Sequence, residues 1–418
     1  MAPTTEGVIV NSYIYGAVVT LDANDDGVCG STEPKVVSSM TGAFSFPGLG
    51  DHMVCSIGGY NTATNLPMMG ELRAAAGSPV ITPLTTLMVS QLPPHPTSAD
   101  IATAQGNIEK QLSLPAGSLS LDPVTAIASN PKIEQTNAAV QAMLATASES
   151  VAAFAGIAKP TDASTATQKA DYQSAVNLVF SNAAKAVATS LAAAPAPVDL
   201  TDSSKSAATT TFVGNVVQST ITAVNTAAAA TGGTNATATL LKAAAPAAAA
   251  TLAKTSPVNA AAFVAASISA SVQSVAQIAP STDAAANKAA IAASETKAQS
   301  NTSIVNLVAS VQINAPTLFA ASATAAPAEM ATLSQVLLPS ASVVANTVYT
   351  APTSAVNDAL TTVVAAAKVT SITTASITAL QAAVVATPAA PTQVDLTKVV
   401  LPTTPALPAP QVLTGAGA

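Results

Sequence analysis

The stretch Leu21-Asp22-Ala23-Asn24-Asp25-Asp26-Gly27-Val28-Cys29-Gly30-Ser31-Thr32-Glu33 is the part of the sequence that most constrains the fold. It contains D-x-N-x-D-G, five further residues and a Glu, the order in which a twelve-residue loop places oxygen ligands around Ca²⁺. Side-chain oxygens would come from Asp22, Asn24 and Asp26, a backbone carbonyl from Val28, and a bidentate carboxylate from Glu33. Gly27 permits the sharp bend. The alternative is an acidic turn held only by Asx hydrogen bonds.

The flanks of this loop predict strands rather than the helices of an EF-hand. From Val8 to Thr20 the residues alternate at period two, and Tyr13 and Tyr15 add β propensity. The loop therefore joins strands in a hairpin. Four carboxylates, on Asp22, Asp25, Asp26 and Glu33, would repel one another there without a cation, so we expect a structural Ca²⁺.

The chain has two cysteines, Cys29 inside the loop and Cys55 on a later predicted strand. A disulfide between them would fasten the loop to the sheet and would indicate an oxidising compartment. The alternative is a pair of buried free thiols in a reducing compartment.

The composition is rich in small side chains and poor in charge. Of the 418 residues, 49% are hydrophobic but 3% aromatic, Trp is absent, and 8% are charged, against about 25% in ordinary globular domains. The length allows two or three domains. Only 14 Lys and Arg are scattered through a chain of net charge -7, which argues against a nucleic-acid partner. Low charge together with calcium fits a protein outside the cell.

No targeting or membrane segment is expected. The start, Met1 to Glu6, lacks the basic and apolar regions of a signal peptide, so a secreted protein would be represented by its mature form. Polar residues or Pro interrupt every apolar stretch before about 18 residues, which predicts no transmembrane helix.

Residues 1–83 are predicted to form a small calcium-binding β domain, a sandwich or open barrel of five to seven strands. After the loop, strands are expected at 35–39, 43–46, 52–57, 69–74 and 80–82. Phe44 and Phe46 should share one face of their strand.

Several of these segments resemble the calcium-binding B-type domains of bacterial surface adhesins, which are relatives of the collagen-adhesin B and carboxypeptidase-regulatory-like sandwiches. The similar segments are Tyr13 to Asp22, the D-x-N-x-D-G loop, Glu33-Pro34, Thr41 to Phe46 and Gly58-Gly59. Gly70 to Ser78 and Thr82 to Leu87 look like the segment that follows such a domain in large secreted proteobacterial proteins. The resemblance covers roughly the first 90 to 130 residues and implies a calcium-loaded β-sandwich. Isopeptide chemistry is not carried over, because Lys35 is the only Lys before Lys110.

From residue 84 the hydrophobic period becomes helical. Residues 84–131 should form short helices, one at 84–92 and one capped by Ser98, followed by a linker from residue 115. Residues 132–387 read as an Ala/Thr/Val-rich helical domain of about eight to ten helices. The clearest apolar stripes run from Ile133 to Phe154 and from Tyr172 to Leu191. The expected fold class is thus α+β and multidomain.

Residues 388–418 are predicted to be a Pro-rich extended tail. The tail contains a strand-like run without a neighbouring partner, a candidate donor strand for a sheet edge in the same chain or a neighbouring one; its apolar residues are Val394, Leu396, Val399 and Leu401.

Residues 301–418 carry only five charged side chains. A soluble monomer usually displays more charge, so we expect contacts with other copies of the chain, although a neutral Ser/Thr surface is the alternative.

Catalytic patterns are scarce. The two histidines, His52 and His95, are interpreted as incidental, and nucleophile-elbow, zinc-helix and phosphate-loop motifs are absent from the sequence. The sequence therefore predicts a non-enzymatic extracellular structural protein of a bacterial surface that assembles with itself into a filament or layer. The alternative is a monomeric adhesin that binds other cell-surface components.

Overall fold

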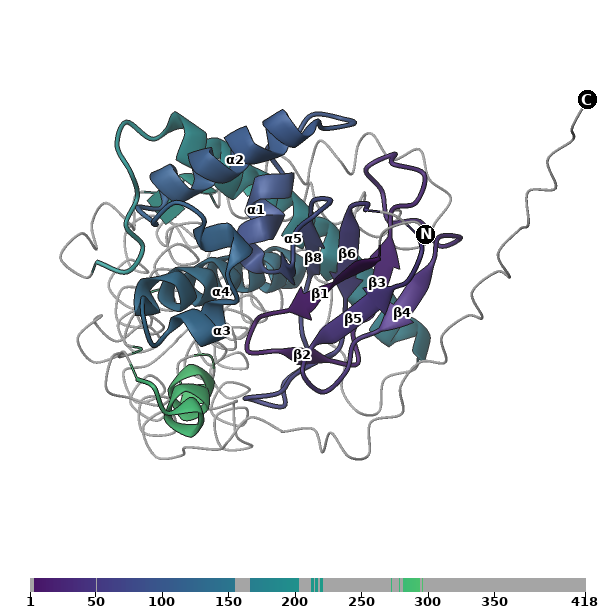
Figure 1. The fold of residues 1–418 in the computed structure, drawn as a ribbon, viewed down its shortest axis with the longest axis horizontal. Coiled ribbons are helices and arrows are strands. Elements are labelled where there is room, and N and C mark those ends of the chain that lie inside the picture. The colour runs from purple at the N-terminus through teal and green to yellow at the C-terminus, as the bar shows by residue number, and fades with distance from the viewer. Residues whose placement is uncertain are drawn as a thin grey trace, which may run out of the picture.

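The computed structural model describes residues 4–49, 51–154 and 166–202, and it describes 212–213, 215–216, 219–220, 272, 278, 281–293 and 295 farther along the chain. Within these residues the fold is α+β, with β-sheets in the N-terminal part followed by helices (Figure 1). Most of the expected helical domain beyond residue 202 lies outside the described residues. The tail also lies outside them, including Val394, Leu396, Val399 and Leu401.

The described residues contain nine short strands in three sheets. The three-stranded sheet has the order β5-β1-β9, the two-stranded sheet pairs β2 with β7, and the four-stranded sheet has the order β4-β3-β6-β8. The strands are β1 (Thr5–Ile9), β2 (Ile14–Tyr15), β3 (Val18–Leu21), β4 (Lys35–Val37), β5 (Ala43–Phe46), β6 (Val54–Ile57), β7 (Tyr60–Asn61), β8 (Glu71–Ala74) and β9 (Val80–Ile81).

The first predicted strand is in fact three strands. The alternation from Val8 to Thr20 is interrupted because Ser12 and Tyr13 have φ values of 62° and 58°, in the left-handed region that a strand does not use. The chain therefore turns between β1 and β2. The prediction for β5 is confirmed: Phe44 and Phe46 are buried, the residues between and before them are exposed, and the two rings pack edge to face 6.2 Å apart.

Six helical segments follow the sheets in the described residues up to 193. They are α1 (Pro83–Val89), α2 (Ser98–Gln111), the 3-10 helix η1 (Ser118–Ser120), α3 (Pro123–Ala126), α4 (Pro131–Phe154) and α5 (Ala166–Ala193). The cap of α2 is Thr97 rather than the predicted Ser98, since the Thr97 hydroxyl accepts from the backbone N–H of Asp100. The predicted linker from residue 115 contains η1 and α3, and its Leu119 and Ile127 are buried.

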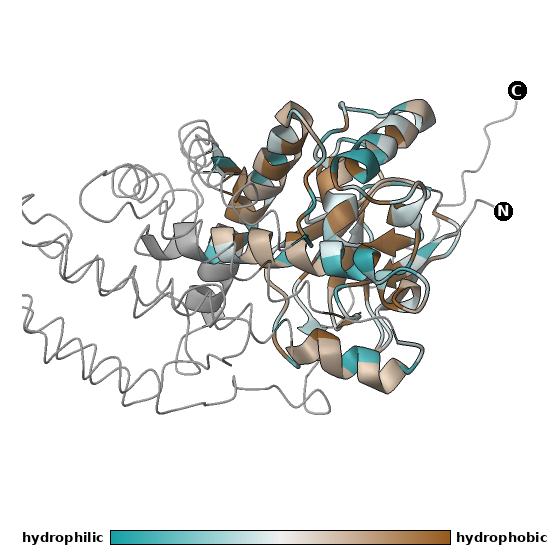
Figure 2. Ribbon diagram, turned by 90° about the vertical axis from the view of Figure 1, so that its left-hand side faces the viewer, coloured by the Kyte–Doolittle hydropathy of each residue, from teal (hydrophilic) through white to brown (hydrophobic). Residues whose placement is uncertain are grey.

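Strands and helices share one hydrophobic cluster. It runs from Ile9 and Phe46 through Leu84 to Val140 on α4 and Phe180 on α5. Figure 2 shows hydrophobic residues along both strands and helices, with hydrophilic residues in short patches. Across the part of the chain that can be described, no helix is long and apolar enough to cross a membrane.

Candidate metal site

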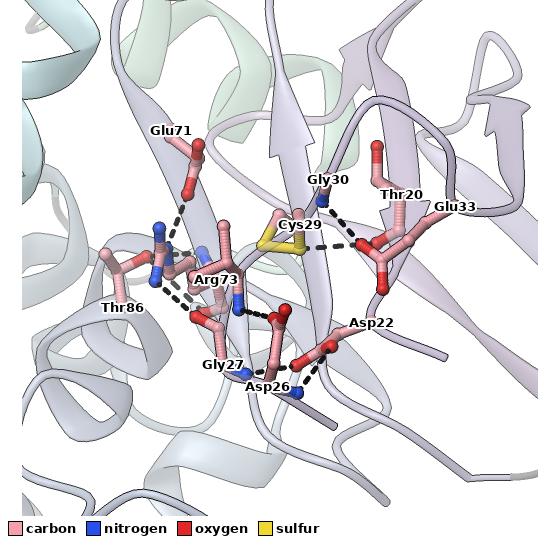
Figure 3. Close-up of a disulfide and its surroundings, with 12 residues drawn as sticks. Thr20, Asp22, Asp26, Gly27, Cys29, Gly30, Glu33, Glu71, Arg73 and Thr86 are labelled. Atoms are coloured by element: carbon pink, nitrogen blue, oxygen red, sulfur yellow. Dashed lines mark hydrogen bonds and ion pairs between the residues drawn. A yellow bond between two sulfur atoms is a disulfide. The ribbon is translucent and has the colours of Figure 1, made fainter. Parts of the chain in front are cut away.

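The acidic loop connects β3 to β4, which pair in antiparallel fashion with Thr20 opposite Lys35. The predicted strand–loop–strand arrangement is therefore confirmed, and helices do not flank the loop. Figure 3 shows the disulfide at Cys29 together with the loop residues Asp22, Asp26 and Glu33.

The first half of the loop is organised around the carboxylate of Asp22. This residue is 1% exposed, and its two oxygens accept from the backbone N–H groups of Asp26 at 3.2 Å and Gly27 at 2.9 Å. The Asn24 side-chain oxygen also accepts from the Asp26 N–H, at 3.1 Å. Positive φ values of 56° at Asp25 and 79° at Gly27 allow the chain to turn this tightly. These contacts bring Asp22, Asn24 and Asp26 together.

The second half is held by Glu33 and Lys35. One carboxylate oxygen of Glu33, Oε2, accepts from the Gly30 N–H at 2.5 Å. The other oxygen, Oε1, is buried and has no hydrogen-bond partner among the residues that the structure describes. The Lys35 ammonium donates to the carbonyls of Gly30 and Ser31, each at 2.8 Å. A buried carboxylate oxygen without a donor is costly, so Glu33 Oε1 is the atom in this loop that most needs a ligand.

The predicted disulfide is confirmed. Cys29 is bonded to Cys55, with Cα atoms 6.1 Å apart, and the alternative of two free thiols is wrong. Cys55 lies on β6 opposite Thr20 of β3. The bond therefore joins the middle of the loop to the strand next to the one from which the loop departs.

Neighbouring side chains hold the outer edge of the loop. His52, which was interpreted as incidental, has its Nδ1 2.8 Å from Asp25 Oδ1. Arg73, on β8, donates to the Gly27 carbonyl at 3.3 Å. The side chain of Val28, whose carbonyl is a predicted ligand, points outward and leaves the residue 58% exposed.

The carboxylates of the loop do not form a compact cluster among the described residues. Among the described residues, no three His, Cys, Asp or Glu side chains are gathered as a group that could hold a metal ion. The remaining predicted ligands are an amide and a backbone carbonyl. The calcium site at Asp22, Asn24, Asp26, Val28 and Glu33 therefore stays a prediction.

Sequence reasoning missed a buried polar stripe on α4. Its members recur at spacings of three, four and seven residues beside the predicted apolar stripe, and all are buried: Glu134, Asn137, Gln141 and Ser148. Burial raises the pKa of Glu134 to about 8 with a further contribution from the charge of Asp122, even though a hydrogen bond from Asn137 favours its charged form. The heptad spacing of these polar residues was the signal available in the sequence.

Comparisons with known proteins give no relative for this chain. No family model matches it, and neither a curated protein nor a solved structure does.

Proposed function

We propose that this chain is an extracellular, non-catalytic structural protein whose N-terminal β domain, a sandwich of the B type, is made rigid by Ca²⁺ in the loop from Asp22 to Glu33. The observation that carries the proposal is Glu33 Oε1, a buried carboxylate oxygen with no partner in the described part of the chain, at the position where a calcium loop supplies its bidentate ligand. The residues present fit the ion, since all the predicted ligands are oxygens, which Ca²⁺ prefers.

The tight turn around Asp22 in the first half of the loop supports the proposal. Asp22 accepts from the N–H of Gly27, and Asp26 accepts from the amide of Asn24, so hydrogen bonds within the loop link the three predicted side-chain ligands. We expect Ca²⁺ to draw Glu33 toward Asp22 and Asp26, because the ion offsets the repulsion among their carboxylates. Its role is structural: it would fix the hairpin, as the disulfide does from the other side.

The disulfide supports the compartment proposed here. Disulfides persist in oxidising surroundings and are rare in the cytosol, and weak calcium loops are filled where ambient calcium is high. We therefore place the protein, as a proposal, outside the cell on a bacterial surface.

Calcium binding is tested by isothermal titration of the full chain after chelator treatment. We expect heat of binding in the wild type and its loss from the loop in Asp22→Asn combined with Glu33→Gln. Asp51→Asn is the matched control, because Asp51 is an exposed carboxylate that bonds Gly77 outside the loop. Unchanged binding in the loop variant would show that the ion sits elsewhere.

Self-association is the second part of the proposal. Its support is the sequence from residue 301 onward, with charges only at Glu329, Asp358, Lys368, Asp395 and Lys398. So few charges leave most of that surface without strong hydration, and contact with other copies would cover it.

Electron microscopy with and without Ca²⁺ separates this proposal from its alternative. Filaments or sheets are expected, and deletion of residues 391–418 should abolish them if the tail supplies a donor strand. Polymers that survive the deletion would refute the donor-strand route. Dispersed particles under all conditions would instead favour a monomeric adhesin that binds other surface components.

A further inference from the structure

The segment that follows α5 is fastened to the ends of two other helices. Val198 donates its backbone N–H to the carbonyl of Gln111, the last residue of α2, at 2.7 Å. Asp199 accepts from the ammonium of Lys132, at the start of α4, also at 2.7 Å. Leu200 is 3% exposed and belongs to the hydrophobic cluster that strands and helices share. We call the place that this segment occupies, at Gln111, Lys132 and the adjoining part of the cluster, the docking seat.

The segment also holds its own turn. Thr201 donates its backbone N–H to Asp199 Oδ1 at 3.0 Å and its hydroxyl to the same oxygen at 2.7 Å. An Asp side chain that accepts from the residue two positions later forms a local turn that needs no other part of the chain. The four residues Val198-Asp199-Leu200-Thr201 therefore carry both the turn and the groups that bind the seat.

The way out of the seat lies at the surface. Pro195, Ala196 and Pro197, which connect α5 to the segment, are exposed. The side chains of Lys132 and Asp199 are 29% and 17% exposed, and ion pairs in contact with water contribute little to stability. Burial of Leu200 is therefore the main anchor. Release of the segment would leave α4 and α5 packed directly against each other.

The same tetrapeptide occurs a second time, in the tail, as Val394-Asp395-Leu396-Thr397. Ala-Ala-Pro precedes both copies at the same spacing, at residues 193–195 and 389–391. Matches of Ala follow from the composition of the chain, but Asp395 is one of only three acidic residues after position 300. The tail copy thus has the carboxylate, the Leu and the Thr with which the internal copy occupies the seat.

The residues after the two copies favour the tail. The internal copy continues with Asp202-Ser203-Ser204-Lys205, whereas the tail copy continues with Lys398-Val399-Val400-Leu401. The tail therefore offers the same contacts and, in addition, apolar side chains next to a hydrophobic cluster. Burial of these side chains would favour the tail over the internal segment.

We propose that residues 394–397 of a second copy of this chain take the docking seat in place of residues 198–201, so that chains join by exchanging one segment for its repeat. This inference rests on the proposed self-association and deepens it, because it names the surface that receives the tail. Tail and seat are different surfaces, so each added chain leaves one tail and one seat open. Such a heterologous contact builds an open-ended assembly.

Binding is measured by the fluorescence anisotropy of a fluorescein-labelled peptide with the sequence of residues 389–401, titrated with the full chain. Leu200→Ala removes the anchor of the internal segment and frees the seat, so this variant should bind the peptide about tenfold more tightly than the wild type. Adding Lys132→Glu should weaken binding about tenfold, and a peptide with Asp395→Lys should recover it. Lys185→Glu is the matched control, because Lys185 is an exposed lysine on α5. Circular dichroism checks that each variant is folded.

A peptide that does not bind the Leu200→Ala variant, or that binds it equally well after Lys132→Glu, would overturn the proposal. In the full chain, Asp395→Lys should abolish the filaments or sheets, and adding Lys132→Glu should restore them, because the reversed pair again carries opposite charges. Polymers that are insensitive to Asp395→Lys would refute exchange at this seat but leave self-association standing. Particles that stay dispersed in every variant would contradict self-association, and the peptide titration alone then decides whether the seat accepts the tail sequence.

Discussion

Replacing Gly70 with Ala should disrupt the contact between the β part and α5. Gly70 has φ +93°, and a Cβ added there would lie 2.2 Å from Cδ2 of the Phe180 ring, far inside van der Waals contact. Phe180 is fully buried in the shared hydrophobic cluster. The ring therefore has little space into which it can move.

Two costs add at this position. A left-handed backbone costs a residue with a Cβ about 1–2 kcal/mol, and forcing extra volume into a packed core costs about 1–3 kcal/mol. The expected loss for Gly70→Ala is therefore about 2–5 kcal/mol of unfolding free energy. Gly117→Ala isolates the first cost, because Gly117 has φ +82° but no heavy atom within 4 Å of its added Cβ.

The assay is urea unfolding of the full chain, followed by circular dichroism, with the midpoint compared among wild type, Gly70→Ala and Gly117→Ala. Gly70→Ala should shift the midpoint clearly further than Gly117→Ala. Combining Gly70→Ala with Phe180→Leu should give less than the sum of the two single losses, since the smaller side chain relieves the clash. Equal midpoints for the two glycine variants, with additive effects of Phe180→Leu, would refute the packing of α5 against Gly70.

Three further predictions concern the disulfide, a buried acid and a helix cap. Cys29→Ser opens a covalent loop with a sequence separation of 26 residues. The chain-entropy relation predicts a loss of about 3.5 kcal/mol of unfolding free energy in urea unfolding. Reductant should no longer lower the stability of this variant, and a variant that is still weakened by reductant would contradict the prediction. The pKa of Glu134 is raised to about 8 in the folded state, from 4.5 as its ordinary value. Between these two pH values the folded protein therefore keeps a proton on Glu134 that the unfolded chain has released. Stability should therefore fall as pH rises from about 4.5 to 8, with a slope of up to about 1.4 kcal/mol per pH unit, and Glu134→Gln should flatten this slope in thermal melts; an unchanged slope would show that another group is responsible. Thr82→Val removes the hydroxyl that accepts from the Thr85 N–H at 3.0 Å, and it should cost about 0.5–2 kcal/mol in urea unfolding, whereas no loss would mean that the cap is dispensable.

Local patterns in the sequence predicted the local features well. The alternation of Phe44 and Phe46, the hairpin around the acidic loop and the Cys29–Cys55 bond were all predicted, because each depends on residues within about 30 positions of one another. The boundary errors were also local. The β1–β2 turn was missed since Ser12 and Tyr13 take left-handed backbone angles, which their residue types do not favour.

The contacts of the buried polar residues could not be predicted in the same way. Ser12 and Glu295 meet across 283 positions, and Gln141 contacts Met68 across 73. The polar residues of α4 were compatible with a solvent-exposed stripe until the tertiary contacts were known. Helical periodicity shows which residues share a face, but what covers that face is decided by the rest of the fold.

The position of β1 in its sheet affects how the chain can fold during synthesis. Thr5–Ile9 occupies the centre of the three-stranded sheet, where Val8 pairs with Ala43 on one side and with Val80 on the other. Because β9 ends at Ile81, β1 cannot pair along both of its edges until residue 81 has been synthesised. During that interval the nascent chain exposes an unpaired strand edge. A chaperone that shields Thr5–Ile9 until β9 is complete should thus raise the yield of folded protein.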